Sequence, residues 1–282
     1  MRPRRLTFTD HRRELGANRY VYAVVSRRAQ GLSIGINLNP DKVCNFDCPY
    51  CQVDRTPAGL AGLSRGVVVA DLITELDTLL DWVADGTLWS RPPFDTTPAP
   101  LRRVADIAFA GDGEPTSSRA FAAAAEQVKV ARSRHRLDAT PIRLLTNATL
   151  LHRASVRRGL PHIDDIWAKL DAGTEAWFRR VDGTTFPFAR ILENLTALAC
   201  ERPITLQSMF PAISGEGPSE AEIDAWLERI CAIRLTGGTI QAIQVYTVAR
   251  DPSDPTFGAL PAGRLEQIAA RARALGFHAQ VY

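Results

Sequence analysis

The chain has 282 residues, of which 45% are hydrophobic and 23% charged, and its formal net charge is +3. This composition is typical of a folded soluble protein, and so small a net charge does not by itself imply nucleic-acid binding. The sequence has no apolar run near the ~20 residues that cross a bilayer and no long signal core, so we expect a cytoplasmic protein without a membrane partner.

The first 31 residues are rich in arginine. Asp10 and Glu14 oppose the following basic residues: Arg2, Arg4, Arg5, Arg12, Arg13, Arg19, Arg27 and Arg28. The segment is either an arm that faces phosphates or a solvated edge, and we favour the edge because the whole chain uses arginine far more than lysine. We predict a basic N-terminal extension at 1–31 and a single core domain at 32–282.

Three of the five cysteines stand together at CxxxCxxC spacing, as Cys44, Cys48 and Cys51, after an apolar segment at 32–38 that we predict to be a strand. Soft thiolates select iron–sulfur clusters, zinc or Cu(I), and three of them leave one iron of a cubane open to a small molecule. We favour a cluster. A structural zinc site would need a fourth Cys or His nearby, and a glutaredoxin-like dithiol would leave Cys44 without a role.

Strands and helices are predicted to alternate along the rest of the chain. The strands are expected at 104–110, 142–145, 163–170, 204–210, 240–248 and 277–282, and the helices at 72–83, 119–135, 187–200, 219–233 and 265–275. The proline-rich stretch 87–103 is predicted to be a surface insertion. This order favours an α/β fold with a parallel sheet and outer helices, either a partial barrel or a doubly wound sheet.

Polar residues follow these strands at their carboxyl ends, where ligands collect in parallel α/β folds. The run Gly111-Asp112-Gly113-Glu114 follows the strand at 104–110, and Asn147 follows the next one. Lys169 and Asp171 end a strand of apolar residues. A buried charge is costly without a partner, so these two either line a site or pair with each other at its rim, and we favour the site.

The cysteine spacing, with aromatic Tyr50 before the third cysteine, resembles the signature of the radical S-adenosylmethionine (SAM) superfamily. Longer stretches, 37–54, 109–116 and 167–173, are similar to Fe-S oxidoreductases related to wyosine-base synthases. The resemblance implies a partial (β/α)6 barrel whose three cysteines hold a [4Fe-4S] cluster with SAM on the open iron. It also implies a cofactor site formed by Tyr50, Gly111, Asp112, Gly113, Glu114, Asn147, Lys169 and Asp171.

An enzyme of this kind cleaves SAM reductively, and the 5′-deoxyadenosyl radical takes hydrogen from a substrate. The resemblance therefore implies a flavodoxin- or ferredoxin-like electron donor and a substrate that we leave unidentified, possibly RNA, with no catalytic residue assigned. Because there is no second cysteine set, wyosine synthesis is not expected, and Cys200 and Cys231 are predicted to be buried small hydrophobes. Two alternatives are a thiol–disulfide oxidoreductase that uses Cys48 and Cys51, and a zinc-containing RNA-binding protein.

Overall fold

The computed structural model describes residues 18–26, 29–53, 55, 66–249 and 252–282, so most of the predicted N-terminal extension lies outside the described residues. The chain divides into two compact units. Unit 1 comprises Met1–Val43, Gly62–Leu144 and Arg153–Asp164, and unit 2 comprises Cys44–Ala61, Leu145–His152 and Asp165–Tyr282. The cysteine motif therefore falls in unit 2 and the Gly-Asp-Gly-Glu motif in unit 1.

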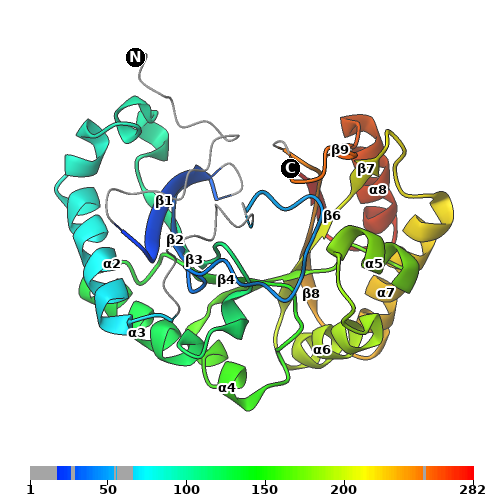
Figure 1. The fold of residues 1–282 in the computed structure, drawn as a ribbon, viewed down its shortest axis with the longest axis horizontal. Coiled ribbons are helices and arrows are strands. Elements are labelled where there is room, and N and C mark those ends of the chain that lie inside the picture. Colours follow the sequence, from blue (N-terminus) through cyan, green and yellow to red (C-terminus); the bar gives the residue numbers. More distant parts are fainter. Residues whose placement is uncertain (1–17, 27–28, 54, 56–65, 250–251) are drawn as a thin grey trace. The chain divides into compact units, whose positions relative to one another are not determined.

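Unit 1 is built on neighbouring strands (Figure 1). In order they are β1 (Val21–Ser26), β2 (Gly31–Ile36), β3 (Val104–Phe109) and β4 (Ile142–Thr146), whose last two residues belong to unit 2. The β1–β2 pair is antiparallel, and β2–β3 and β3–β4 are parallel. The α-helices among the described residues of this unit are α2 (Val69–Ala84), α3 (Phe121–Arg134) and the short α4 (Ala154–Arg157).

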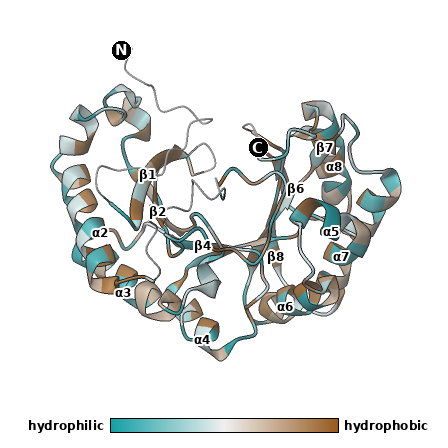
Figure 2. Ribbon diagram, viewed as in Figure 1, coloured by the Kyte–Doolittle hydropathy of each residue, from teal (hydrophilic) through white to brown (hydrophobic). Residues whose placement is uncertain are grey.

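Helix α2 forms because its apolar residues recur at helical spacing. Leu72, Leu76, Leu79 and Leu80 are buried on one face, while the intervening positions are more polar. Figure 2 shows both hydrophobic and hydrophilic residues along this helix. The Glu75 carboxylate accepts the backbone N–H groups that lead into β1, which ties the helix to that edge strand.

Unit 2 contains a second parallel set of strands (Figure 1). In order they are β5 (Asp165–Lys169), β6 (Ile204–Met209), β8 (Ile240–Tyr246) and β10 (Ala279–Val281). The short strands β7 (Pro211–Ile213) and β9 (Phe257–Ala259) form a separate antiparallel pair. The helices are α5 (Glu175–Asp182), α6 (Phe188–Glu201), α7 (Glu220–Leu235) and α8 (Ala262–Ala274).

The two faces of these parallel strands differ in character. Ile166, Ala168, Leu206, Ile243 and Val245 alternate onto one face and are completely or almost completely buried. The other face carries a polar row, because Lys169, Gln207 and Gln244 are in register across β5, β6 and β8. The Gln207 Nε2 donates to Gln244 Oε1 at 2.8 Å. Unit 2 therefore has one apolar face and one face with polar groups at the strand ends.

The structure confirms the α/β fold with mostly parallel strands and flanking helices. The insertion at 87–103 forms three short 3₁₀ helices: Thr87–Ser90, Phe94–Thr96 and Ala99–Leu101. Strand β1 was not predicted and lies inside the expected N-terminal extension; the boundary at residue 32 stays a prediction. None of the helices in the described ranges is both long and apolar enough to cross a membrane.

The prediction that Cys200 is buried is wrong, and Cys231 is only partly buried. Cys200 lies one residue before the end of α6, just past the buried pair Leu198 and Ala199, so its side chain points off the apolar stripe. Its Sγ lies 3.4 Å from the carbonyl oxygen of Thr236.

Candidate metal and cofactor site

The three clustered cysteines lie on one loop of unit 2, all half-buried and none in a disulfide. A backbone hydrogen bond from the Cys51 N–H to the Cys48 carbonyl, 2.8 Å, folds the last part of the loop into a turn, and Arg55 Nη1 lies 3.0 Å from Cys51 Sγ. Within the described ranges, no three His, Cys, Asp or Glu side chains already converge on one metal position. The donor set nevertheless fits an iron–sulfur cluster chemically, because three cysteine thiols outside any disulfide stand on one short loop.

Aromatic packing fixes the first part of this loop against helices α5 and α6. The buried Phe46 ring meets Phe178 edge-on at 5.6 Å, and Phe178 stacks on Phe188 at 4.9 Å. Helix α5 ends at Gly183, whose φ of +56° is the left-handed conformation common at helix C-termini. A Cβ at Gly183 would lie 2.0 Å from the Asp47 carbonyl oxygen, so this end of α5 touches the loop backbone directly.

A second segment of unit 2 holds the far part of the loop. The Ser253 N–H donates to the Cys51 carbonyl at 3.1 Å, and the Ser253 hydroxyl donates to the Pro49 carbonyl at 2.8 Å. The Asp254 N–H donates to the same Pro49 oxygen at 3.0 Å. The loop backbone around the second and third cysteines is therefore fastened from two sides, by the end of α5 and by residues 253–254.

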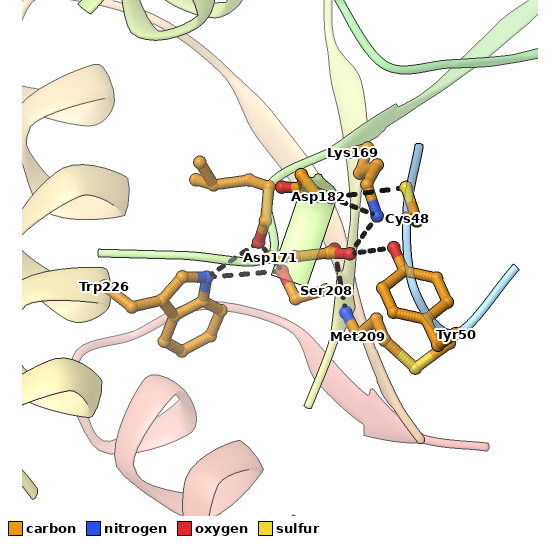
Figure 3. A network of polar contacts seen from close by, with 9 residues as sticks. Cys48, Tyr50, Lys169, Asp171, Asp182, Ser208, Met209 and Trp226 are labelled. Carbon is orange, nitrogen blue, oxygen red and sulfur yellow. Dashed lines mark hydrogen bonds and ion pairs between the residues drawn. The ribbon is translucent and has the colours of Figure 1, made fainter. Parts of the chain in front are cut away.

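A buried polar network lies beside the loop (Figure 3). Lys169 Nζ contacts Asp171 Oδ2 and lies 2.9 Å from Asp182 Oδ1 and 4.6 Å from the centre of the Tyr50 ring. Tyr50 donates its hydroxyl proton to Asp171 Oδ2 at 2.6 Å, and Cys48 Sγ lies 3.8 Å from Asp182 Oδ1. The network therefore links β5, the end of α5 and the cysteine loop.

Asp171 is the centre of this network. Its Oδ1 accepts the Met209 N–H at 2.9 Å, while its Oδ2 accepts from both Tyr50 and Lys169, and the residue is 1% exposed. Lys169 and Asp171 pair with each other, and their place in a cofactor site stays a prediction. Just behind Asp171, the Trp226 indole and the Ser208 hydroxyl both donate to the carbonyl of Leu170, which holds this strand end in place (Figure 3).

The pKa values of these groups follow from burial and charge. Burial raises the pKa of Asp182 to about 7, although Lys169 opposes the shift. Burial disfavours the charged form of Lys169, but the adjacent Asp171 and Asp182 outweigh it and raise the pKa of Lys169. Burial also raises the pKa of the Cys48 thiol well above its usual value. The free Cys48 is therefore a thiol near neutral pH.

Asn147 lies in a separate network at the end of β4. Its Nδ2 donates to Asn45 Oδ1 at 2.7 Å, and its Oδ1 accepts from the N–H and hydroxyl of Thr149. Asn45 Nδ2 in turn donates to the Thr149 hydroxyl at 2.6 Å. Asn147 and Thr149 are 7% and 0% exposed, so this closed triangle anchors the residue after Cys44 to the strand end.

The Gly-Asp-Gly-Glu motif follows β3 in unit 1 and packs against the segment that leads from β2. A Cβ at Gly111 would lie 2.3 Å from Asn37 Oδ1, and one at Gly113 would lie 2.0 Å from the Val43 carbonyl oxygen. Asn37 Nδ2 donates to Asp112 Oδ2 at 2.7 Å. The two glycines are therefore required for close packing of two backbone segments.

Glu114 is 3% exposed and caps the short helix Pro115–Ser117, because its Oε1 accepts from the N–H and the hydroxyl of Thr116. Beside it, Asn39 Nδ2 donates to the Ser117 hydroxyl at 3.1 Å, while Asn39 Oδ1 is buried and has no hydrogen-bond partner among the described residues. A buried acceptor without a donor is costly, and a ligand N–H group would satisfy it. Asn39 Oδ1 is therefore a candidate acceptor for such a group.

The predicted site residues fall into three groups. Tyr50, Lys169 and Asp171 meet beside Cys48, Asn147 forms its own network in the same unit, and the motif 111–114 lies in unit 1. Asp182 was not among the predicted residues, because helix α5 was not predicted. A prediction of this helix would have supplied one signal. An acidic residue in the last turn of a helix is disfavoured by the helix dipole, so its presence there indicates another role.

No family model matches the chain. Over 170 residues it is 28% identical to GTPase Obg of Brachyspira hyodysenteriae, a match that covers 60% of this chain and 21% of that protein. Over 152 residues it is 29% identical to a UPF0026 protein of Synechocystis, covering 54% of this chain and 48% of the relative. The matches span less than half the length of these curated relatives.

Two solved structures share the fold over nearly the whole chain. A radical SAM methyltransferase from Sphaerobacter thermophilus superposes with a TM-score of 0.57 at 14% identity, covering 93% of this chain and 68% of the other. SuiB from Streptococcus suis, bound to S-adenosylmethionine, gives a TM-score of 0.59 at 12% identity, covering 91% and 52%. The chain thus has the α/β fold of radical SAM enzymes, which confirms the resemblance at the level of the fold.

Proposed function

We propose that this protein is a radical SAM enzyme that holds a [4Fe-4S] cluster on Cys44, Cys48 and Cys51. The proposal is supported chiefly by three cysteines that stand on a single loop, outside any disulfide, in a chain with this fold. When bound, such a cluster supplies one electron that splits the carbon–sulfur bond of SAM into methionine and a 5′-deoxyadenosyl radical, which takes a hydrogen atom from the substrate.

The chain's own residues position the cofactors in this proposal. The contacts of Gly183 and Ser253 hold the backbone of the cysteine loop in place. In unit 1, the buried acceptor Asn39 Oδ1 beside the motif 111–114 is suited to the ammonium group of SAM. Lys169, Asp171 and Tyr50 form the polar wall beside Cys48.

The proposal specifies the type of reaction and leaves the substrate class open. We propose hydrogen abstraction from a substrate of unassigned class, with RNA among the candidates, and electron supply by a flavodoxin- or ferredoxin-like protein. A thiol–disulfide oxidoreductase is less well supported, because the burial that raises the pKa of Cys48 is the opposite of what an attacking cysteine needs.

The test is anaerobic reconstitution of the purified chain with iron and sulfide, followed by dithionite reduction and addition of SAM. We expect about one cubane per chain and release of 5′-deoxyadenosine. A matched variant with Cys44→Ala, Cys48→Ala and Cys51→Ala should do neither, whereas Cys200→Ala should behave as the wild type. Retention of zinc, or a stable Cys48–Cys51 disulfide without SAM cleavage, would refute the proposal.

A further inference from the structure

Asp182 stands out among the buried acids of unit 2 because it touches the cysteine loop and nothing in the proposed reaction uses it. Its Oδ1 lies 3.8 Å from Cys48 Sγ and 2.9 Å from Lys169 Nζ, and the residue is 1% exposed. A carboxylate in the last turn of α5 is unfavourable to the helix dipole. The position is therefore not explained by the stability of the helix.

The surroundings hold Asp182 and Cys48 in a fixed relation. Helix α5 and the glycine that follows it touch the two loop residues before Cys48, through the Phe46–Phe178 ring contact and through Gly183 against the Asp47 carbonyl. Lys169 fixes the carboxylate from the β5 side (Figure 3). Groups that contact a ligand atom and are themselves held by packing are typical supports of a metal ligand.

We propose that Asp182 is a positioning residue for Cys48, and that its charge lowers the reduction potential of a cluster held by the three cysteines. This inference rests on the proposed function, because it requires the cluster. A reduced cluster carries one more negative charge than the oxidised cluster. A carboxylate close to one of its sulfur ligands in a buried site therefore disfavours reduction.

Lys169 contacts Asp182, and Asp171 contacts Lys169. Their charges change the size of the shift in reduction potential without cancelling it. Lys169 carries a positive charge, but it is shared with Asp171, which it also contacts. When both carboxyl groups are ionised, the charges of Lys169, Asp171 and Asp182 sum to one negative charge beside Cys48. Replacing Asp182 with asparagine keeps the size of the side chain and removes that net charge.

The test is a redox titration of the reconstituted protein at one fixed pH well above 7, where the Asp182 carboxyl, whose pKa burial raises to about 7, is ionised. The electron paramagnetic resonance signal of the reduced cluster follows the titration. We expect Asp182→Asn to shift the potential upward and Asp182→Glu, which keeps the charge, to return it towards the wild-type value. Glu222→Gln is the matched control. Glu222 is also a buried acid of unit 2, but its carboxylate accepts from Gly173 and Thr174 and not from the cysteine loop.

If Asp182→Asn takes up no cluster, the pair Asp182→Glu and Asp182→Gln is compared instead, since the two have the same length and differ in charge. A higher potential for the glutamine variant supports the inference, and equal potentials overturn it. An unchanged potential in Asp182→Asn, or an equal shift in Glu222→Gln, likewise overturns it and leaves the proposed function standing. If the wild type takes up no iron, both fail.

Discussion

The Tyr50 hydroxyl lies 2.6 Å from Asp171 Oδ2, so the residue before the third cysteine is hydrogen-bonded to a buried carboxylate at the end of β5. Tyr50→Phe removes this bond and leaves the ring in place. A hydrogen bond to a charged group contributes about 1.5 kcal/mol, so we expect the free energy of unfolding of the apo protein to fall by about that amount.

Chemical denaturation at neutral pH measures the effect. Tyr282→Phe is the control, because within the described part of the chain the Tyr282 hydroxyl bonds only to exposed Gln280. This variant should lower the free energy of unfolding by a few tenths of the loss expected for Tyr50→Phe at most. Equal losses in both variants would mean that the bond to Asp171 has no special weight.

Gly183→Ala should disturb the cysteine loop. The left-handed conformation costs a residue with a side chain about 1 to 2 kcal/mol, and here the new Cβ would also lie 2.0 Å from the Asp47 carbonyl oxygen. We expect a loss of stability beyond about 2 kcal/mol together with weaker iron uptake on reconstitution. Gly215→Ala provides a matched control, because Gly215 has a φ of +86° and a Cβ there would meet open space, with no described atom beyond its chain neighbours within 4 Å. If the two variants take up equal amounts of iron, the contact with Asp47 is unimportant.

Asn147→Ala should open the triangle that joins the cysteine loop to β4. It removes the acceptor of two Thr149 groups and the donor to Asn45, and it leaves buried Thr149 without these partners. We expect a loss of about 1 to 3 kcal/mol in the free energy of unfolding. Thr149→Ser, which keeps the hydroxyl, should cost less; a larger cost for the serine variant would contradict this account.

Asp77 on α2 predicts a pH dependence in unit 1. Burial acts to raise the pKa of its carboxyl, but the hydrogen bonds and positive charges of Arg134 and His135 together outweigh burial and lower the pKa below its usual value. A depressed pKa contributes stability above the unfolded value of about 4, and this contribution is lost as the pH falls through the folded value.

We therefore expect Asp77→Asn to lower the free energy of unfolding by at most about 1 kcal/mol at neutral pH, with the difference disappearing in acid. Thermal unfolding across the acidic range measures it. Glu193→Gln, at an exposed pair with Arg190, is the control and should show little change. A difference that grows in acid would contradict the assignment.

The periodic segments of the fold could be predicted from sequence because burial imposes their pattern. Leu72, Leu76, Leu79 and Leu80 lie on the buried face of α2, as their spacing indicates. Strand β1 was missed because its apolar residues adjoin a run of arginines. Helix α5 was missed because it has only eight residues, and contacts with the cysteine loop and Glu222 hold it in place.

The candidate site was predictable only in part. The polar residues predicted after the strands include Lys169 and Asp171, which the structure brings together with Tyr50 of the cysteine loop. The partners could not be read from spacing: Asp182 reaches Lys169 through tertiary packing, and Glu114 proves to cap the helix Pro115–Ser117. The glycines at 111 and 113 pack closely against the segment that follows β2, which spacing alone did not predict, and their part in a cofactor site stays a prediction.

The full set of donors around Asp171 constrains what can bind there. With the Met209 amide on one oxygen and Tyr50 and Lys169 on the other, described donors occupy three of the roughly four acceptor positions of this carboxylate. A ligand hydroxyl that replaces one of these donors exchanges hydrogen bonds with little net gain in their number. Affinity must come from the rest of the ligand, while Asp171 rejects groups that cannot replace the donor they remove.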